Sequence, residues 1–180
     1  MPLQIDEKLF VDIAAYIEKW YVKEPDRRTE QEQWLKAITE KTCFEAAPEP
    51  IEPEAISRQS LEKALEQMDE SFSEMLLRKI DERGMTDAQC YKKANIDRKL
   101  FSKIRSNTLY KPSKPTVLAF ALALELPLAE MQDMLGKAGF TLSHSNKFDI
   151  IVEYFVKRGN YNVNEINEAL LAFGQNLLGA

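Results

Sequence analysis

The stretch TDAQCYKKANIDRKLFSKIRSNTLYKPSKPTVLAFALALELPLAEM, residues 86–131, decides the fold because it combines clear helix boundaries with a regular apolar pattern. Thr86 and Asp97 are residue types that favour the N-terminus of a helix, and Asn95 between them tolerates the left-handed backbone that ends one. Ser113 predicts a further helix start, with Pro115 in the first turn, where its missing N–H costs little. Only a few residues connect the first two of these helices, so we expect them to cross steeply.

Helical patterns flank this stretch on both sides. Ser71, in a capping box with the glutamate three residues later, predicts the start of a helix that ends at Gly84. After the stretch, one helix ends at Gly139 and two more follow, the last begun by Asn162 or Asn164. Because no strand-like alternation exceeds four residues, we predict an all-α fold with a five-helix core and two extra C-terminal helices. The apolar residues expected to face inward include Met75, Leu76, Ile80, Leu100, Phe101, Ile104, Leu118, Leu122, Phe148, Ile151, Phe155, Ile166 and Leu170.

Residues 1–44 predict an N-terminal helical hairpin. Apolar residues recur at helical spacing from Leu9 to Trp20, and Thr29 begins a second helix with a capping box. Two helices of this size cannot bury their apolar faces by themselves, so they must pack on the rest of the chain, a second copy or another protein. The prolines and glutamates of residues 45–57, EAAPEPIEPEAIS, predict an extended linker to the remaining domain.

The charge is unevenly distributed along the chain. The formal net charge is −5, yet residues 1–70 carry 9 basic and 17 acidic side chains, whereas residues 71–140 carry 12 basic and 8 acidic ones. Between Tyr91 and Lys114 there are eight basic residues and one acidic residue. This density favours a polyanionic partner, although a solvated helix face is the simpler interpretation of a charge cluster by itself. The acidic N-terminal region is a possible site for a protein partner.

Cysteine use and the absence of sorting signals favour a reduced, cytoplasmic protein. Cys43 and Cys90 lie far apart and match no metal-ligand spacing. The N-terminus lacks the basic flank and apolar run of a signal peptide. The longest apolar run, residues 117–124, is too short to span a membrane.

Residues 74–135 resemble the five-helix, lambda-repressor-like helix-turn-helix domain of phage repressors and XRE-type regulators. The elements that recur in order are Thr86, Asn95-Ile96-Asp97, Phe101-Ser102-Lys103-Ile104, Pro112-Ser113 and the run from Ala121 to Met131. The chain departs from the family pattern at Tyr91, Arg105, Glu125 and the longer loop 106–111, and the large Tyr91 implies a wider helix crossing. With its C-terminal helical extension, this domain would span residues 58–180. Residues 70–179 also resemble a helical tail that is fused to other bacterial domains such as macrodomains.

The resemblance implies a transcriptional regulator that places helix 97–106 in the DNA major groove and acts as a homodimer. The residues that would face base edges are Arg98, Lys99, Ser102 and Lys103. The residues that would meet phosphates are Thr86, Lys92, Lys93, Arg105, Lys111, Ser113 and Lys114. The alternative is a helical protein-interaction or adaptor module, antitoxin-like or part of a phage-defence system, without sequence-specific DNA binding.

No residue pattern predicts an enzyme, a metal site or a cofactor. His144 stands in a Ser-rich turn without a cysteine or acid at ligand spacing, which favours a surface capping role. Cys90 falls on an inward helix position, so we expect it in the core. The glycines form no phosphate-binding loop.

Overall fold

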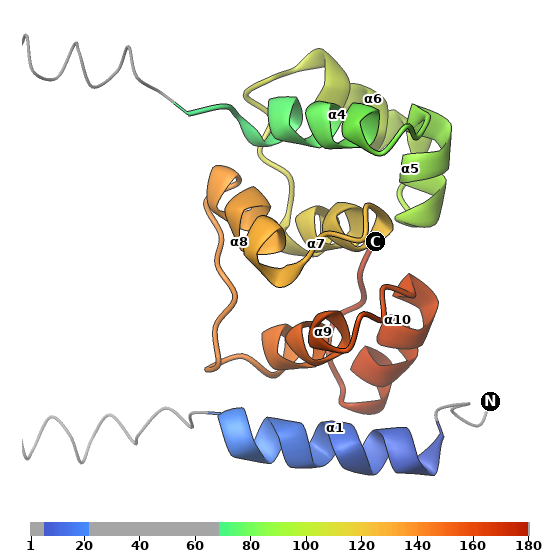
Figure 1. Cartoon of the computed structure of the whole chain (residues 1–180), viewed down its shortest axis with the longest axis vertical. Coiled ribbons are helices and arrows are strands. Elements are labelled where there is room, and N and C mark those ends of the chain that lie inside the picture. The colour runs from blue at the N-terminus through green and yellow to red at the C-terminus, as the bar shows by residue number, and fades with distance from the viewer. Residues whose placement is uncertain (1–5, 22–68, 180) are drawn as a thin grey trace, which may run out of the picture. The chain divides into compact units, whose positions relative to one another are not determined.

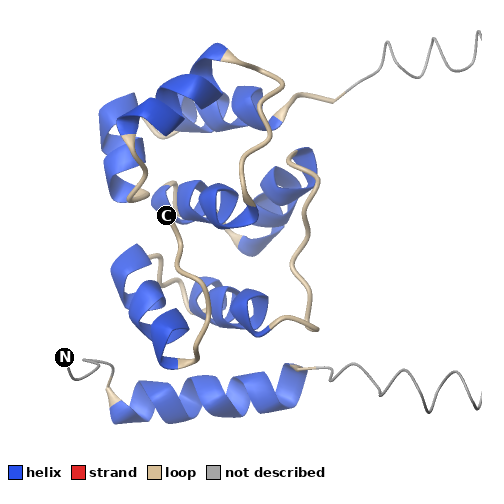
Figure 2. Cartoon of the chain, turned by 180° about the vertical axis from the view of Figure 1, so that it is seen from behind, coloured by secondary structure: helices blue, strands red, loops and turns tan. Residues whose placement is uncertain are grey.

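The computed structural model describes residues 6–21 and 69–179, and within these ranges the regular structure is entirely helical (Figure 1, Figure 2). The all-α class is therefore confirmed for the described part of the chain. The second helix of the predicted hairpin and the predicted linker 45–57 lie outside the described residues. The described helices are α1 (Glu7–Trp20), α4 (Phe72–Glu82), α5 (Asp87–Lys93), α6 (Arg98–Ser106), α7 (Lys114–Ala123), α8 (Leu128–Lys137), α9 (Lys147–Lys157) and α10 (Val163–Ala172).

Local hydrogen bonds fix the helix starts that the sequence predicts. At α4, the Glu74 N–H donates to the Ser71 hydroxyl at 3.3 Å, and the Ser71 N–H donates to the Glu74 carboxylate at 2.8 Å. Thr86 and Gln89 form the same reciprocal box at α5. Asp97 accepts a bond of 2.6 Å from the backbone N–H two residues later, at the start of α6. Each bond satisfies an N–H that has no partner within the helix, which confirms these three starts.

Left-handed residues end several helices. Gly84 (φ +60°) follows α4 and Gly139 (φ +81°) follows α8, as the sequence predicts. Asn95 (φ +55°) occupies the turn between α5 and α6, again as predicted. Glu125 (φ +52°) is the unusual member, because a residue with a β-carbon pays a steric cost in this conformation that glycine does not.

Helix α7 is the central element of the core. Every residue from Thr116 to Ala123 is buried, so this helix is enclosed on all sides and not along one face only. It contacts α5, α8 and α10, and Figure 1 shows it between the α4–α6 group and the α9–α10 pair. The Phe120 ring lies 6.5 Å from the Phe72 ring and 5.9 Å from the Phe101 ring, measured between centroids.

Helix α1 packs on α9, so the rest of the chain covers its apolar face. Ile13 and Ile17 are buried in this contact. The Tyr16 ring meets the edge of the Tyr154 ring at 5.1 Å between centroids. The Phe10 ring stacks on Phe173, beyond the end of α10, at 4.7 Å. The sequence left open whether this helix packs on the rest of the chain, on a second copy or on another protein. The structure shows it packed on the rest of the chain.

A polar cluster on α9 accompanies this contact. The Glu153 side chain is 7% exposed; its carboxylate lies 2.8 Å from His144 Nε2 and forms an ion pair with Lys157. The Lys157 ammonium also donates to the Tyr16 hydroxyl of α1 at 3.1 Å. The His144 ring centroid lies 5.4 Å from that of Trp20. His144 therefore has an acidic partner, Glu153, that the sequence analysis did not find.

Glu153→Gln is expected to reduce the loss of stability in acid. Burial by itself raises the pKa of the Glu153 carboxyl, but bonds from Lys157 and His144 lower it more, so the pKa lies below its ordinary value of 4.5. A carboxyl whose pKa is lowered by folding stabilises the folded state above its unfolded pKa, and this contribution is lost as the pH falls through the folded pKa. Urea unfolding at about pH 6 and about pH 3 should show a larger loss for the parent than for the variant.

The exposed Glu18 on α1 offers the matched control, because Glu18→Gln removes the same charge without disturbing a buried pair. Its acid dependence should follow that of the parent protein. Equal acid dependence of the parent and Glu153→Gln would contradict the prediction.

The C-terminal tail returns to the turn between α5 and α6. The side-chain oxygen of Asn167 accepts the Leu178 N–H at 2.7 Å, and its side-chain nitrogen donates to the Leu178 carbonyl at 3.2 Å. The Leu178 side chain is buried. A β-carbon on Gly179 (φ +77°) would lie 2.8 Å from the Ala94 carbonyl oxygen and 2.9 Å from that of Asn95, so this position requires glycine. The C-terminal extension thus packs directly on the connection that precedes α6.

Candidate nucleic-acid interface

Helices α5 and α6 form the compact pair that the sequence predicts, joined by residues 94–97. Ala94 and Ile96 in this connection are buried, which ties the turn to the core. Phe101 and Ile104 anchor the inner face of α6. The half-buried Tyr91 ring packs against Phe101 at 5.6 Å between centroids, so it fills the space between the two helices.

The outer face of α6 carries the four predicted base-contact residues, and all of them are exposed: Arg98, Lys99, Ser102 and Lys103. Within the described ranges, no carboxylate oxygen lies within 4.0 Å of the Arg98, Lys99 or Lys103 side-chain nitrogens. The Lys103 ammonium lies over the Tyr110 ring, 4.9 Å from its centroid. The three charges on this face are therefore available to an external anion.

The seven predicted phosphate-contact residues differ in what they already bind. Lys92 and Lys111 are exposed and have no acidic partner among the described residues. Lys93 pairs with Glu125 at 2.5 Å, and Arg105 pairs with Asp87. These two exposed pairs contribute little to stability and are easily exchanged for another anion.

The two predicted hydroxyl contacts, Thr86 and Ser113, stand at helix starts. The Thr86 hydroxyl is engaged with Gln89 in the capping box of α5. Ser113 precedes α7 as predicted, but its side chain makes no capping bond to the helix backbone. Its Oγ instead lies 2.8 Å from the Thr116 hydroxyl.

Lys114 has a structural role that the sequence analysis did not find. Its ammonium donates to Asp149 of α9 at 2.5 Å; the Lys114 side chain is 21% exposed and that of Asp149 only 1%. The same carboxylate oxygen accepts the Ser143 N–H at 2.8 Å. A cation held by a buried carboxylate is poorly placed for phosphate, so this pair competes with the predicted contact. The sequence signal was an acid inside the apolar run from Phe148 to Phe155.

The described residues show neither a reactive thiol nor a metal site. Cys90 is buried, as predicted, and burial raises the pKa of its thiol to about 12, so the reactive thiolate is suppressed. Among the described residues, no group of three or more His, Cys, Asp or Glu side chains is placed to hold a metal ion. None of the described helices combines the length and apolar character needed to cross a membrane.

Comparison with known proteins identifies no relative: no family model matches the chain, and neither the curated proteins nor the solved structures contain a significant match.

Proposed function

We propose that this chain binds double-stranded DNA through α6, with α4–α8 acting as a lambda-repressor-like helix-turn-helix core. The observation that carries the proposal is the outer face of α6, where Arg98, Lys99 and Lys103 are exposed without acidic partners among the described residues. The major groove of B-DNA admits an α-helix. Arginine can bind both acceptors of a guanine edge, lysine adds a point charge, and Ser102 tolerates several bases.

Lys92 and Lys111 extend this cationic surface beyond α6. Both are exposed and unpaired among the described residues, so they are the best placed of the predicted contacts to meet phosphates. Each phosphate neutralised by a cation releases condensed counterions, which makes the affinity fall steeply with salt. Lys93 and Arg105 would join them after giving up exposed acidic partners.

The proposal includes a homodimer. A single small domain covers little DNA, and a two-fold pair of domains reads two half-sites about one helical turn apart. Sedimentation of the full chain with and without duplex DNA would measure the number of copies bound. A single copy per duplex at saturation would contradict this part of the proposal.

Combining Arg98→Ala with Lys103→Ala is expected to weaken binding to duplex DNA by at least about tenfold at low salt, because each lost charged hydrogen bond is worth about 1.5–3 kcal/mol. The slope of log affinity against log salt should stay close to that of the parent, since both residues are assigned to base edges and the assigned phosphate contacts remain. The free energy of unfolding should change by less than about 0.5 kcal/mol, because both side chains are exposed and alanine favours helix. Fluorescence anisotropy of labelled DNA measures the first two quantities, and urea unfolding the third.

The matched control is Lys8→Ala with Lys19→Ala, which removes the same charge from exposed positions of α1. Its DNA affinity should stay within about twofold of the parent value, given the screening of distant charges. Failure of the parent protein to bind DNA at low salt would rule out the proposed function. Unfolding of the α6 variant would show that the outer face of that helix has been misassigned.

A protein-interaction module is the second candidate, and exposed apolar side chains favour it. Val11 of α1 is 59% exposed and Leu171 of α10 is 57% exposed. Exposed apolar side chains of this kind are typical of protein contacts where they form a patch. This candidate predicts the reverse of the DNA result: the α6 double variant leaves partner binding intact, and Val11→Ser with Leu171→Ser abolishes it.

A further inference from the structure

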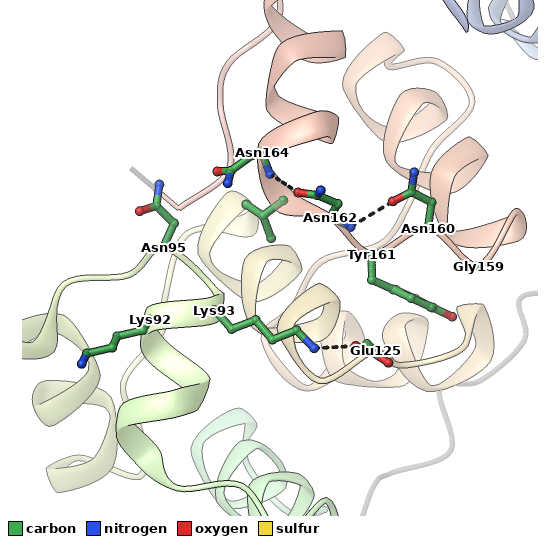
Figure 3. A pocket seen from close by; sticks show the side chains of 10 residues that line it. Lys92, Lys93, Asn95, Glu125, Gly159, Asn160, Tyr161, Asn162 and Asn164 are labelled. Atoms are coloured by element: carbon green, nitrogen blue, oxygen red, sulfur yellow. Dashed lines mark hydrogen bonds and ion pairs between the residues drawn. The ribbon is translucent and has the colours of Figure 1, made fainter. Parts of the chain in front are cut away.

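A pocket of about 730 Å³ lies where the end of α5, the α7–α8 turn and the α9–α10 loop meet (Figure 3). Its volume falls within the range of small-molecule sites, but its lining is more polar than is usual for them. Two lysines, four asparagines, one glutamate and one tyrosine contribute to it. A ligand that fits this lining must carry negative charge and several hydrogen-bonding groups.

The Lys93–Glu125 ion pair supplies an exchangeable anion site. The ammonium and carboxylate lie 2.5 Å apart, and their side chains are 43% and 53% exposed. Figure 3 shows Lys93 reaching from α5 toward Glu125 in the α7–α8 turn. An exposed pair of this kind contributes little to stability, so a phosphate can replace the glutamate on Lys93 at little cost.

The α9–α10 loop supplies amide and aromatic groups. The Asn162 side-chain oxygen Oδ1 caps α10 and accepts the backbone N–H of Asn164 at 3.1 Å. The side-chain NH₂ groups of Asn162 and Asn164 donate to no other described residue. A carboxamide NH₂ of this kind can donate to N7 of adenine. In Figure 3 the half-buried Tyr161 side chain extends from the same loop on the side of Glu125, and a tyrosine ring offers a stacking face for a base.

We propose that this pocket binds an adenine mononucleotide. The phosphate occupies the position of the Glu125 carboxylate on Lys93, the base stacks on Tyr161, and its polar edge pairs with Asn162 and Asn164. The claim does not require the proposed DNA binding, but the two share Lys92 and Lys93, so a bound nucleotide would compete for cations that are also assigned to DNA phosphates. Because Lys93 ends α5 just before the turn to α6, a bound nucleotide would contact the segment that positions α6.

Calorimetric titration of the full chain with adenosine monophosphate tests the proposal. We expect saturable binding with a Kd below about 1 mM. Lys93→Ala should weaken it about tenfold or more, through the lost charged hydrogen bond, and Tyr161→Ala about fivefold or more, through lost stacking. Glu125→Gln should tighten it by up to about fivefold, because the competing carboxylate is removed.

Lys8→Ala is the matched control, since it removes an exposed lysine of α1 that does not line the pocket. Its affinity for the nucleotide should equal that of the parent. Adenosine and ribose 5-phosphate should each bind more weakly than the whole nucleotide. The proposal is overturned if no binding heat is detected when the nucleotide concentration is raised well above about 1 mM. It is also overturned if adenosine or ribose 5-phosphate binds as tightly as the whole nucleotide. The same holds if Lys93→Ala and Glu125→Gln leave the affinity unchanged while circular dichroism shows intact helices.

Discussion

Lys114→Met is expected to destabilise the folded protein by about 3–5 kcal/mol, because it leaves the carboxylate of Asp149 buried without its cation. With Lys114 gone, the one remaining donor within the described structure is the Ser143 N–H at 2.8 Å. The second carboxylate oxygen, Oδ1, is buried and already has no hydrogen-bond partner. Urea unfolding followed by circular dichroism measures the effect.

A double variant separates the cost of an unpaired charge from the value of the pair itself. Replacing both partners, Lys114→Met with Asp149→Leu, should recover most of the lost stability, since apolar residues of similar size often substitute well for a buried pair. Lys111→Met is the control for the loss of an exposed lysine nearby, and it should change stability by less than about 0.5 kcal/mol. A loss below about 1 kcal/mol for Lys114→Met would show that Asp149 is not held as a buried ion.

The helix boundaries could be predicted because the interactions that set them are local. Thr86 and Asp97 accept backbone N–H groups two or three residues away. The left-handed conformation of Gly84 and Asn95 is allowed because glycine lacks a β-carbon and asparagine tolerates it. The spacing of apolar residues also predicted which faces are buried, for example Phe101 on α6. For α7 and α9 the burial was wider than the predicted face, because helices pack on each of them from several sides.

Which of the cations pair with acidic side chains could not be predicted in the same way. The sequence shows a cluster of cations, but the partners of Lys93 and Lys114 lie 32 and 35 residues away in the chain. Such pairs form only when the tertiary fold brings separate helices together, so spacing does not indicate them. The same reason hid the pocket that the α9–α10 loop completes. His144 and Glu153 are nine residues apart, but they meet through the path of the loop before α9, which the residue types do not indicate.

Phe120→Ala is expected to destabilise the protein by about 3–5 kcal/mol, the range for a large aromatic residue removed from a packed core. The Phe120 side chain is completely buried, and its ring joins Phe72 of α4 to Phe101 of α6. The change removes apolar area from the core and leaves a cavity that three helices would have to close. Urea unfolding measures the loss, and Phe120→Leu, which keeps most of the volume, should cost only about 1–1.5 kcal/mol.

This substitution also separates folding from DNA binding. Phe120 does not reach the outer face of α6, so any loss of DNA affinity in Phe120→Ala should match the fraction of protein unfolded and disappear in stabilising osmolyte. The Arg98 and Lys103 double variant should behave in the opposite way, with stability retained and affinity lost under all conditions. If Phe120→Ala stays fully folded yet binds DNA more weakly, the position of α6 depends on this ring more finely than burial alone implies. If it costs less than about 1 kcal/mol, α7 is not the central core element that its burial indicates.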